Sequence, residues 1–407
     1  MSGRRPAAPA PHRVLVAGDV WQDGGRVPAT VVIEDGRIAE LALGVHLTDR
    51  TAQCYELPDA LLLPGLIDIH VHGYGGHRAY GESAEIEAVG GLLAAGGATG
   101  FLASVPALPW PETLAAVRRL AAACDRGEPP NLLGIHLEGP YLSPRRPGSQ
   151  PVDNLRTPSL AGYQALRVAG GRAIKMITVA PELDGALALI NACKRDGIVA
   201  AIGHTDAGWE VAAAAFAAGA SHVTHLYNAM RPFHHREPGA VGAALTTESE
   251  RITAELILDG HHVHRAAWEL ARRALGPERL VLVSDALPPA GQNGDGLVWA
   301  GRPIQRRAGR LVGDDGTIAG GDIRLLDAVK QAMGWGATWF EATAMAGRGP
   351  ATVLGLGDRK GALLPGYDGD LLALGPDWRV DLTLIGGRRA WPPVRRPGAG
   401  PGRGGKT

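Results

Sequence analysis

The chain has 407 residues, of which 45% are hydrophobic but only 5% aromatic, so its core must be built mainly from Ala, Val, Leu and Ile. Forty-one basic residues balance forty-one acidic ones, and this zero net charge argues against a nucleic-acid-binding protein or one that docks on an anionic membrane. Three cysteines without metal-ligand spacing, and no apolar run of about 18 residues, predict free thiols in a reducing, cytoplasmic compartment and no membrane span.

The two ends of the chain have related compositions. Residues 1–12 and 393–407 are rich in Pro, Gly and Arg, which is typical of disordered tails. Residues 13–62 contain short Val- and Leu-rich runs separated by Asp-Gly and Gly-Gly turns, and residues 366–392 contain a similar pattern. Two strand-rich segments at opposite ends predict one small β-sandwich domain assembled from both.

Residues 63–365 alternate apolar runs with Ala-rich segments of helical spacing. Eight such runs favour a closed (β/α)8 TIM barrel over an open doubly wound sheet. Residues 291–317 interrupt the alternation and are interpreted as a hairpin insertion. The eight predicted strands lie in "GLIDIHVH", "GATGFLASV", "NLLGIHLEG", "AIKMITVA", "GIVAAIGH", "HVTHLYNA", "ITAELILD" and "RLVLVSDA".

Polar residues end five of these runs, where barrel enzymes place their chemistry. Because side chains alternate along a strand, His70 and His72 of the first run project to the same face, and Asp68 lies on that face one step deeper. Nitrogen and carboxylate ligands of this kind suit one or two divalent metals, Zn²⁺, Fe²⁺, Mn²⁺ or Co²⁺. The candidate ligands are His70, His72, Glu138, His204, His225 and Asp285.

Other readings apply to some of these residues. A single histidine such as His136 or His222 is more often a core residue or a support for a ligand than a ligand itself. Asp285 can act as a general base and acid beside a metal, or only as a structural ligand.

These motifs resemble those of the amidohydrolase superfamily, and most closely its N-acetylglucosamine-6-phosphate deacetylase family, over about residues 13–390. The stretches that carry the resemblance are "LLPGLIDIHVHGYGG", "GIHLEGPYLSP", "AIGHTDAGWEVAAAAFAAGASHVTHLYNAM", "HHREPGAVG", "ELILDGHHVH", "LVSDALPPAG" and "GALLPGYDGDLLAL".

The resemblance implies an amidohydrolase barrel that removes acetate from N-acetylglucosamine 6-phosphate and works as a homodimer. Glu138, His204 and His225 would be the principal metal ligands, and His70 and His72 would add a second metal. Zinc is the favoured ion. Asp285 would take a proton from water and return it to the leaving amine.

The resemblance also implies a set of residues that bind the sugar phosphate. Arg236 and His262 would meet the phosphate, one of them across a dimer interface, although the residues alone favour a surface ion pair between Arg236 and Glu237. The remaining expected contacts are Asn228, Ala229 and the backbone of Ile318, Ala319 and Gly320.

The chain departs from the family pattern near the substrate. Gly148, Ser149 and Gln150 stand where the family has Gly-Ala-His or Gly-Thr-His. Ser149 and Gln150 are expected to contact the substrate, where Gln150 can donate a hydrogen bond but cannot carry a proton at neutral pH. The family's "LAGS" is "IAGGD" at 318–322. Two alternatives therefore stay open: a deacetylase of another N-acyl amino sugar or specialised metabolite, and a catalytically silent sugar-phosphate-binding protein.

Overall fold

The computed structural model describes residues 13–47, 49, 51–249, 252–294 and 297–393. The predicted disorder of residues 1–12 and 393–407 therefore concerns residues that lie outside this part of the chain, apart from Pro393.

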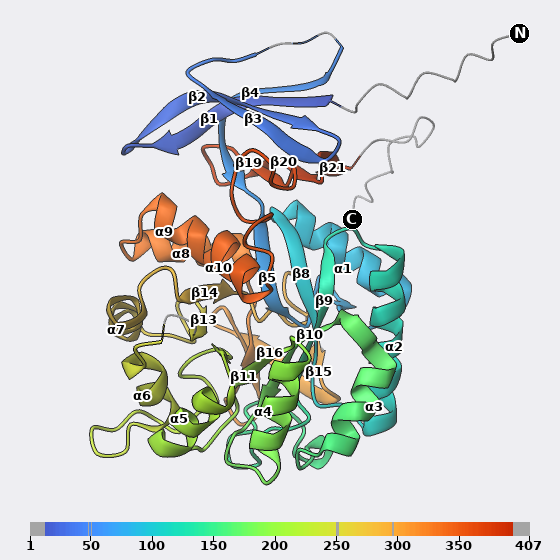
Figure 1. Cartoon of the computed structure of the whole chain (residues 1–407), viewed down its shortest axis with the longest axis vertical. Coiled ribbons are helices and arrows are strands. Elements are labelled where there is room, and N and C mark those ends of the chain that lie inside the picture. The colour runs from blue at the N-terminus through green and yellow to red at the C-terminus, as the bar shows by residue number, and fades with distance from the viewer. Residues whose placement is uncertain (1–12, 48, 50, 250–251, 295–296, 394–407) are drawn as a thin grey trace, which may run out of the picture.

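The centre of the molecule is a barrel of eight parallel strands, each of which coincides with a predicted apolar run (Figure 1). The predicted (β/α)8 architecture is therefore confirmed. In their hydrogen-bonded order the strands are β14 (Leu280–Val283), β13 (Thr253–Ile257), β12 (His222–Val223), β11 (Val199–Ile202), β10 (Ile174–Val179), β9 (Leu132–Glu138), β8 (Ala98–Val105) and β5 (Leu66–Val71).

The barrel closes at the carboxyl ends of its first and last strands. The amide of Asp285 donates to the carbonyl of His70 at 2.9 Å, and the amide of His72 donates to the carbonyl of Ala286 at 2.8 Å. These bonds join the segment that follows β14 to the end of β5. Closure therefore brings Asp285 next to the two histidines of the first strand.

Helices cover the outside of the barrel, and α2 shows how an apolar stripe holds one of them there. In α2 the buried positions recur every three or four residues, from Thr113 and Ala116 to Leu120 and Ala123, and the helix ends at Gly127 with a left-handed φ of 67°. The helices are α1 (Ser83–Ala95), α2 (Trp110–Arg126), α3 (Leu160–Gly170), α4 (Ala186–Arg195), α5 (Trp209–Ala218), α6 (Gly239–Thr246), α7 (Arg265–Leu275), α8 (Leu325–Gly334), α9 (Trp339–Thr343) and α10 (Gly349–Val353).

The strand faces change from apolar to polar towards the carboxyl ends. Leu102 and Met176 belong to an apolar cluster among the strands, and two residues further along the same strands stand Ser104 and Thr178, both buried and hydrogen-bonded to His136. The carboxyl end of the barrel therefore has a polar lining above an apolar floor.

The chain ends form a second sheet at one end of the barrel (Figure 1). Its seven strands have one continuous hydrogen-bonded order, in which the long strand β4 pairs with β1 through one part of its length and with β19 through another. That order is β21 (Arg388–Trp391), β20 (Val380–Ile385), β19 (Leu371–Leu374), β4 (Gln53–Pro64), β1 (Arg13–Gln22), β2 (Gly25–Glu34) and β3 (Arg37–Leu43).

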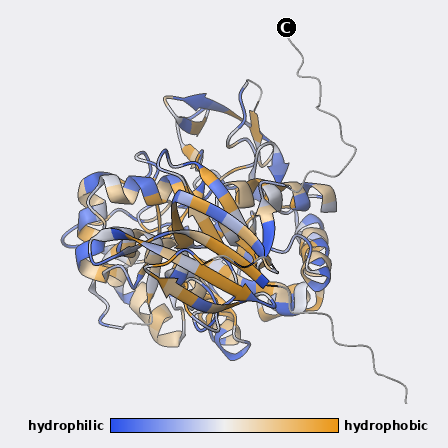
Figure 2. Cartoon of the chain, turned by 90° about the horizontal axis from the view of Figure 1, so that it is seen from above, coloured by the Kyte–Doolittle hydropathy of each residue, from blue (hydrophilic) through white to orange (hydrophobic). Residues whose placement is uncertain are grey.

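Segments from both chain ends share one apolar cluster, which includes Val14, Val31, Leu371 and Leu384. In the view of Figure 2, the strands of this sheet carry both hydrophobic and hydrophilic bands. The hydroxyl of Thr383 in β20 donates to the carbonyl of Ala94 in α1 at 2.8 Å, which ties this sheet to the barrel.

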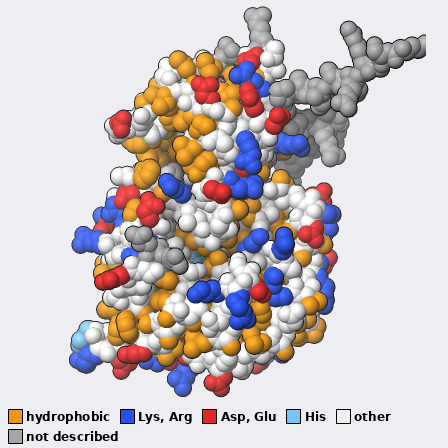
Figure 3. Space-filling model, viewed as in Figure 1, with side chains coloured by type: hydrophobic (Ala, Val, Ile, Leu, Met, Phe, Trp, Pro, Cys, Tyr) orange, Lys and Arg blue, Asp and Glu red, His pale blue; other side chains and the backbone are white. Residues whose placement is uncertain are grey.

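The predicted hairpin insertion is present as an antiparallel sheet of β15 (Leu297–Trp299), β16 (Arg302–Arg307), β17 (Arg310–Gly313) and β18 (Ile318–Gly320). A two-stranded ribbon, β6 (Gly73–Tyr74) and β7 (His77–Arg78), follows the first barrel strand. On the face seen in Figure 3, basic and acidic side chains are intermixed. Within the described residues, no helix is both long enough and apolar enough to span a bilayer.

Candidate metal centre and active site

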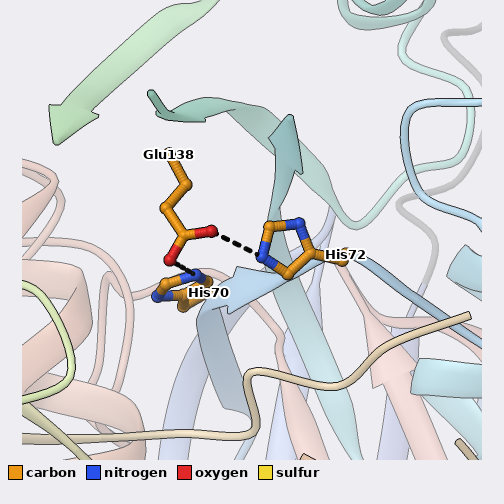
Figure 4. Close-up of side chains that lie close together, drawn as sticks. All are labelled: His70, His72 and Glu138. Carbon is orange, nitrogen blue, oxygen red and sulfur yellow. Dashed lines mark ion pairs between the residues drawn. The ribbon is translucent and has the colours of Figure 1, made fainter. Parts of the chain in front are cut away.

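Four histidines surround the carboxylate of Glu138, which is the last residue of β9. The Oε1 atom lies 3.0 Å from Nε2 of both His204 and His225, and 3.4 Å from Nε2 of His70. The Oε2 atom lies 3.1 Å from Nε2 of His72. Figure 4 shows His70 and His72 each facing a different oxygen of this carboxylate. Glu138 is therefore shared by two ligand groups, one with His70 and His72 and one with His204 and His225.

The hydrogen bond of each Nδ1 atom determines whether Nε2, which faces Glu138, carries a proton or a lone pair. Three Nδ1 atoms contact oxygen: His70 contacts the carboxylate of Glu255 at 2.9 Å, His72 the carbonyl of Ser104 at 3.0 Å, and His204 the carbonyl of Arg146 at 3.0 Å. Because a carbonyl oxygen only accepts, Nδ1 of His72 and His204 carries the proton and Nε2 is free to bind a metal.

These donors fit a divalent cation. The Nε2 atoms of His204 and His225 lie 3.1 Å apart, close to the roughly 3.3 Å expected between two nitrogens bound tetrahedrally to one zinc ion. The Nε2 atom of His70 is buried and has no hydrogen-bond partner among the described residues. Lone pairs of nitrogen that face carboxylate oxygens are stabilised by a cation between them.

Asp285, which follows the last barrel strand β14, completes the group of candidate ligands. Its Oδ1 atom lies 3.3 Å from Nε2 of His70 and 3.5 Å from Nε2 of His72. Asp285, His204 and His225 all have positive φ, at 47°, 46° and 30°. Residues other than glycine rarely adopt this strained backbone conformation, and residues that do so cluster at functional sites. The turns that follow the strands, rather than the strands themselves, aim these three side chains.

Glu255, in β13, supports the site from below. Besides His70, it accepts hydrogen bonds from Nε2 of His222 at 3.1 Å and from the amide of His225 at 3.0 Å. Burial alone would raise the pKa of Glu255, but the neighbouring imidazole of His70 and the hydrogen bonds outweigh it and hold this pKa well below its usual value. Glu255 was not among the predicted site residues, because an acidic side chain inside an apolar run gives no periodic signal.

His136 and His222 lie under the site rather than in it. His136 contacts the hydroxyls of Ser104 at 3.0 Å and Thr178 at 2.8 Å. Burial and the neighbouring imidazole of His70 lower the pKa of His136 well below its usual value, so its ring is neutral. Asp68 is likewise fully buried, where it accepts from the hydroxyl of Ser284 at 2.5 Å, and burial raises its pKa to about 6.

The metal-ligand group opens into a cavity of about 270 Å³. The cavity is lined by most of the residues expected to bind substrate. It is also lined by Trp299, Thr317 and Ile257, which were not predicted. Its lining residues are His72, Glu138, Gly148, Ser149, Gln150, His204, His225, Asn228, Ala229, Ile257, His262, Asp285, Trp299, Thr317, Ile318, Ala319 and Gly320.

Two expected substrate residues differ in their placement. His262 lines the cavity, and its Nδ1 atom is held by Oδ2 of Asp259 at 2.6 Å. Arg236 is exposed and is not among the described residues that line the cavity; its guanidinium lies 2.9 Å from His235. The expected ion pair between Arg236 and Glu237 is not formed within the described residues, where Glu237 contacts Arg231 at 3.8 Å instead.

Trp299, in β15 of the hairpin insertion, closes one side of the cavity, although no site residue was predicted within residues 291–317. Its ring centroid lies 4.8 Å from that of His72, and its indole nitrogen donates to the hydroxyl of Ser149 at 3.0 Å. The hydroxyl of Ser149 donates in turn to the carbonyl of Ala319 at 2.8 Å. Three segments that are distant in sequence are thereby joined at the cavity wall.

Comparisons with known proteins agree with this geometry. The sequence profile of the Amidohydrolase family matches residues 61–390. The chain belongs to the amidohydrolase family. This membership confirms the resemblance and implies a divalent metal, for which the His and Glu groups described above are the candidate ligands.

Within the amidohydrolase family, curated relatives cover nearly the whole chain. An N-acetylglucosamine-6-phosphate deacetylase of Bacillus subtilis (strain 168) is 35% identical over 367 residues, which are 89% of this chain and 92% of that protein. An N-acetylgalactosamine-6-phosphate deacetylase of Escherichia coli O157:H7 is 34% identical over 93% of this chain and 98% of that protein.

Solved structures show the same similarity. An N-acetyl-D-glucosamine-6-phosphate deacetylase mutant from Mycobacterium smegmatis, in complex with N-acetyl-D-glucosamine 6-phosphate, superposes with a TM-score of 0.85 at 32% identity. The match covers 93% of this chain and 99% of that chain. The Thermotoga maritima N-acetylglucosamine-6-phosphate deacetylase has a TM-score of 0.81 at 27% identity, with the same coverage of both chains.

Proposed function

We propose that this chain hydrolyses the acetamide of N-acetylglucosamine 6-phosphate to glucosamine 6-phosphate and acetate, in a reaction that depends on a divalent metal. The observation that carries the proposal is the cluster of four histidines, Glu138 and Asp285 at the base of one cavity, in a chain 35% identical to a deacetylase of this sugar phosphate.

Glu138, His204 and His225 would hold one cation, and Glu138 with His70 and His72 would hold a second. Nitrogen and carboxylate donors close to tetrahedral spacing favour Zn²⁺, with Fe²⁺, Mn²⁺ and Co²⁺ as alternatives. When bound, such a cation acts as a Lewis acid that polarises the acetamide carbonyl and makes water a stronger acid.

Asp285 is the proposed general base and acid. Its side chain lines the cavity and is 11% exposed, so water and substrate can reach it. The carboxylate takes a proton from the attacking water and then gives that proton to the departing amine nitrogen, which leaves as the free amine. Its backbone is fixed on both sides of the residue, because the Asp285 amide donates to His70 and its carbonyl accepts from Gly321 at 2.8 Å.

The sugar phosphate is held at the mouth of the cavity. Asp259 fixes the ring of His262 through Nδ1, which leaves Nε2 for the ligand. Asn228, Ala229 and the backbone of 318–320 line the same cavity. Arg236 points elsewhere in its own chain, and this placement supports a homodimer in which Arg236 of one copy contacts the phosphate bound by the other.

The test is acetate release by chelator-treated protein supplied with Zn²⁺, Fe²⁺, Mn²⁺ or Co²⁺. N-acetylglucosamine 6-phosphate should release acetate faster than unphosphorylated N-acetylglucosamine, because the phosphate contacts are lost in the latter. Tight binding of the sugar phosphate without acetate release under any of these cations would instead identify a silent binding protein and contradict the proposal.

N-acetylgalactosamine 6-phosphate is the second candidate substrate. The Escherichia coli relative acts on that compound by name, and Gln150 and Gly321 both depart from the family pattern near the substrate. A higher kcat/KM for the galactosamine compound than for the glucosamine compound would make it the preferred substrate.

We also propose a cytoplasmic location, supported by the unpaired state of Cys54, Cys124 and Cys193.

The division into a small domain of residues 13–62 with 366–392 and a barrel domain of residues 63–365 is likewise a proposal. Limited proteolysis near 63 and 365 tests it.

A further inference from the structure

Gln150 occupies an unexpected position for a substrate contact. Its side chain is buried at 2% exposure, and its amide nitrogen donates to Oε2 of Glu138. Its amide oxygen accepts from the backbone amide of Ala107 at 2.9 Å. Gln150 therefore links the backbone after β8 to the carboxylate that the two ligand groups share.

The orientation of the Gln150 amide is fixed by chemistry. The backbone N–H of Ala107 can only donate, so the atom that faces it must be the carbonyl oxygen of Gln150. The NH₂ group then faces Glu138 and cannot exchange its role with the oxygen. Unlike an imidazole, this group has no lone pair to offer a cation and no proton to release near neutral pH.

The segment that carries Gln150 is anchored on both sides. The amide of Gln150 donates to the carbonyl of Pro147 at 3.0 Å, and the neighbouring Ser149 is tied to Ala319 and Trp299. Gly148 has a φ of +55°, and a Cβ there would lie 3.2 Å from the ring of His204. The donor is thus held in place before any cation binds.

The two oxygens of Glu138 are made unequal by this donor. Oε1 faces nitrogens of His204, His225 and His70, whereas Oε2 faces His72 and the NH₂ group of Gln150. A hydrogen bond to a carboxylate oxygen withdraws charge from that oxygen and occupies one of its lone pairs. Oε1 therefore remains the stronger ligand.

We propose that Gln150 is a positioning residue that makes the two cation sites unequal. By holding Oε2 of Glu138, it lets the site of His204 and His225 fill first and weakens the site of His70 and His72. This inference rests on the proposed role of Glu138 as a shared metal ligand, and not on the identity of the sugar.

The experiment uses the full chain after chelator treatment, titrated with Co²⁺ alone. Calorimetry gives the two dissociation constants, and the visible absorption of Co²⁺ reports the ligands of each site. Gln150→Glu keeps the shape of the side chain but replaces the donor with a carboxylate. Gln150→Ala removes the donor and serves if the first variant fails to fold, which thermal unfolding shows.

The matched control is Asn154→Ala. Asn154 donates to the carbonyl of the same Ala107 at 2.9 Å, and the structure gives it no contact with Glu138. The control separates the loss of a nearby hydrogen bond from the loss of the bond to the shared carboxylate.

In the wild type, the second Co²⁺ should bind at least about tenfold more weakly than the first, as supporting hydrogen bonds shift metal affinity by about 10- to 100-fold. This gap is the ratio of the second dissociation constant to the first. It should fall by about tenfold or more in Gln150→Glu and by about threefold in Gln150→Ala, while the first dissociation constant stays the same. Asn154→Ala should keep both wild-type constants. An unchanged gap in both Gln150 variants, or an equal shift of both constants, overturns the inference alone. A chain that binds no Co²⁺ overturns the metal centre and the inference together.

Discussion

Replacing Glu255 should affect both the stability of the barrel and the metal site, because this buried carboxylate accepts three hydrogen bonds. Glu255→Leu removes the acceptor of Nδ1 of His70, Nε2 of His222 and the amide of His225, at 2.9, 3.1 and 3.0 Å. Each orphaned donor costs about 1–3 kcal/mol, and loss of one partner from a buried charged group costs about 3–5 kcal/mol. We expect Glu255→Leu to lower the free energy of unfolding by about 3–5 kcal/mol.

Glu255→Gln is the matched control. Its amide oxygen can replace Oε2, which contacts both His70 and His225, and its NH₂ group can face His222 if that ring changes tautomer, because the hydroxyl of Thr253 can donate to it or accept from it. We expect a smaller loss of about 1–2 kcal/mol, the difference between charge-assisted and neutral hydrogen bonds.

Urea unfolding of chelator-treated protein measures these free energies without the contribution of bound metal. Glu255→Leu should also bind metal about 10- to 100-fold more weakly, since Glu255 orients the His70 ring, whereas Glu255→Gln keeps the acceptor for that ring. If Glu255→Leu unfolds within about 0.5 kcal/mol of the wild type and binds metal equally well, Glu255 does not support the site.

Three further outcomes are expected. Asp285→Asn should reduce turnover by about 10²- to 10⁴-fold while the cation content measured by mass spectrometry stays the same, and normal turnover would exclude the proton role. Lys360→Met should cost about 3–5 kcal/mol in urea unfolding, because Nζ of this buried lysine lies 2.6 Å from Asp370, and an effect below about 1 kcal/mol would show that the pair contributes little. Hydrogen bonds from Arg78 lower the pKa of Glu85 to about 2 from 4.5, so its stabilisation is complete above pH 4.5 and is lost as the pH falls towards 2. Glu85→Gln should therefore remove about 1 kcal/mol at neutral pH and flatten acid unfolding in that window, after allowance for solvent screening, and an unchanged acid profile would contradict this.

Local patterns in the sequence predicted the framework of the site. The alternation of "IDIHVH" placed His70 and His72 on one face of a strand, and the apolar runs placed Glu138, His204 and His225 at the same edge of the barrel. These inferences needed only the period of a strand and the rule that parallel strands end at one face.

The rest of the site depends on contacts between distant segments. Glu255 meets His70 only because barrel closure leaves a single strand, β14, between β13 and β5. Trp299 reaches His72 from a hairpin insertion that carries no regular apolar pattern. The left-handed backbone of Asp285 likewise lies in the turn after β14, which no strand pattern encodes.

Gly321 illustrates the same limit. The sequence shows it only as a departure from "LAGS", whereas in the structure a Cβ at Gly321 would lie 2.0 Å from the carbonyl of Ser284. The segment before Asp285 therefore packs against a backbone that has no room for a side chain, and this close approach is visible only in three dimensions.

The most direct measurement of the central claim is the acetate methyl signal in the proton NMR spectrum of chelator-treated protein with N-acetylglucosamine 6-phosphate, before and after addition of Zn²⁺. We predict no acetate from the metal-free protein and steady release once Zn²⁺ is added, with release slowed by about 10²- to 10⁴-fold in Asp285→Asn. Release at the same rate without metal, or no release with any of the four candidate cations, would contradict a metal-dependent deacetylase.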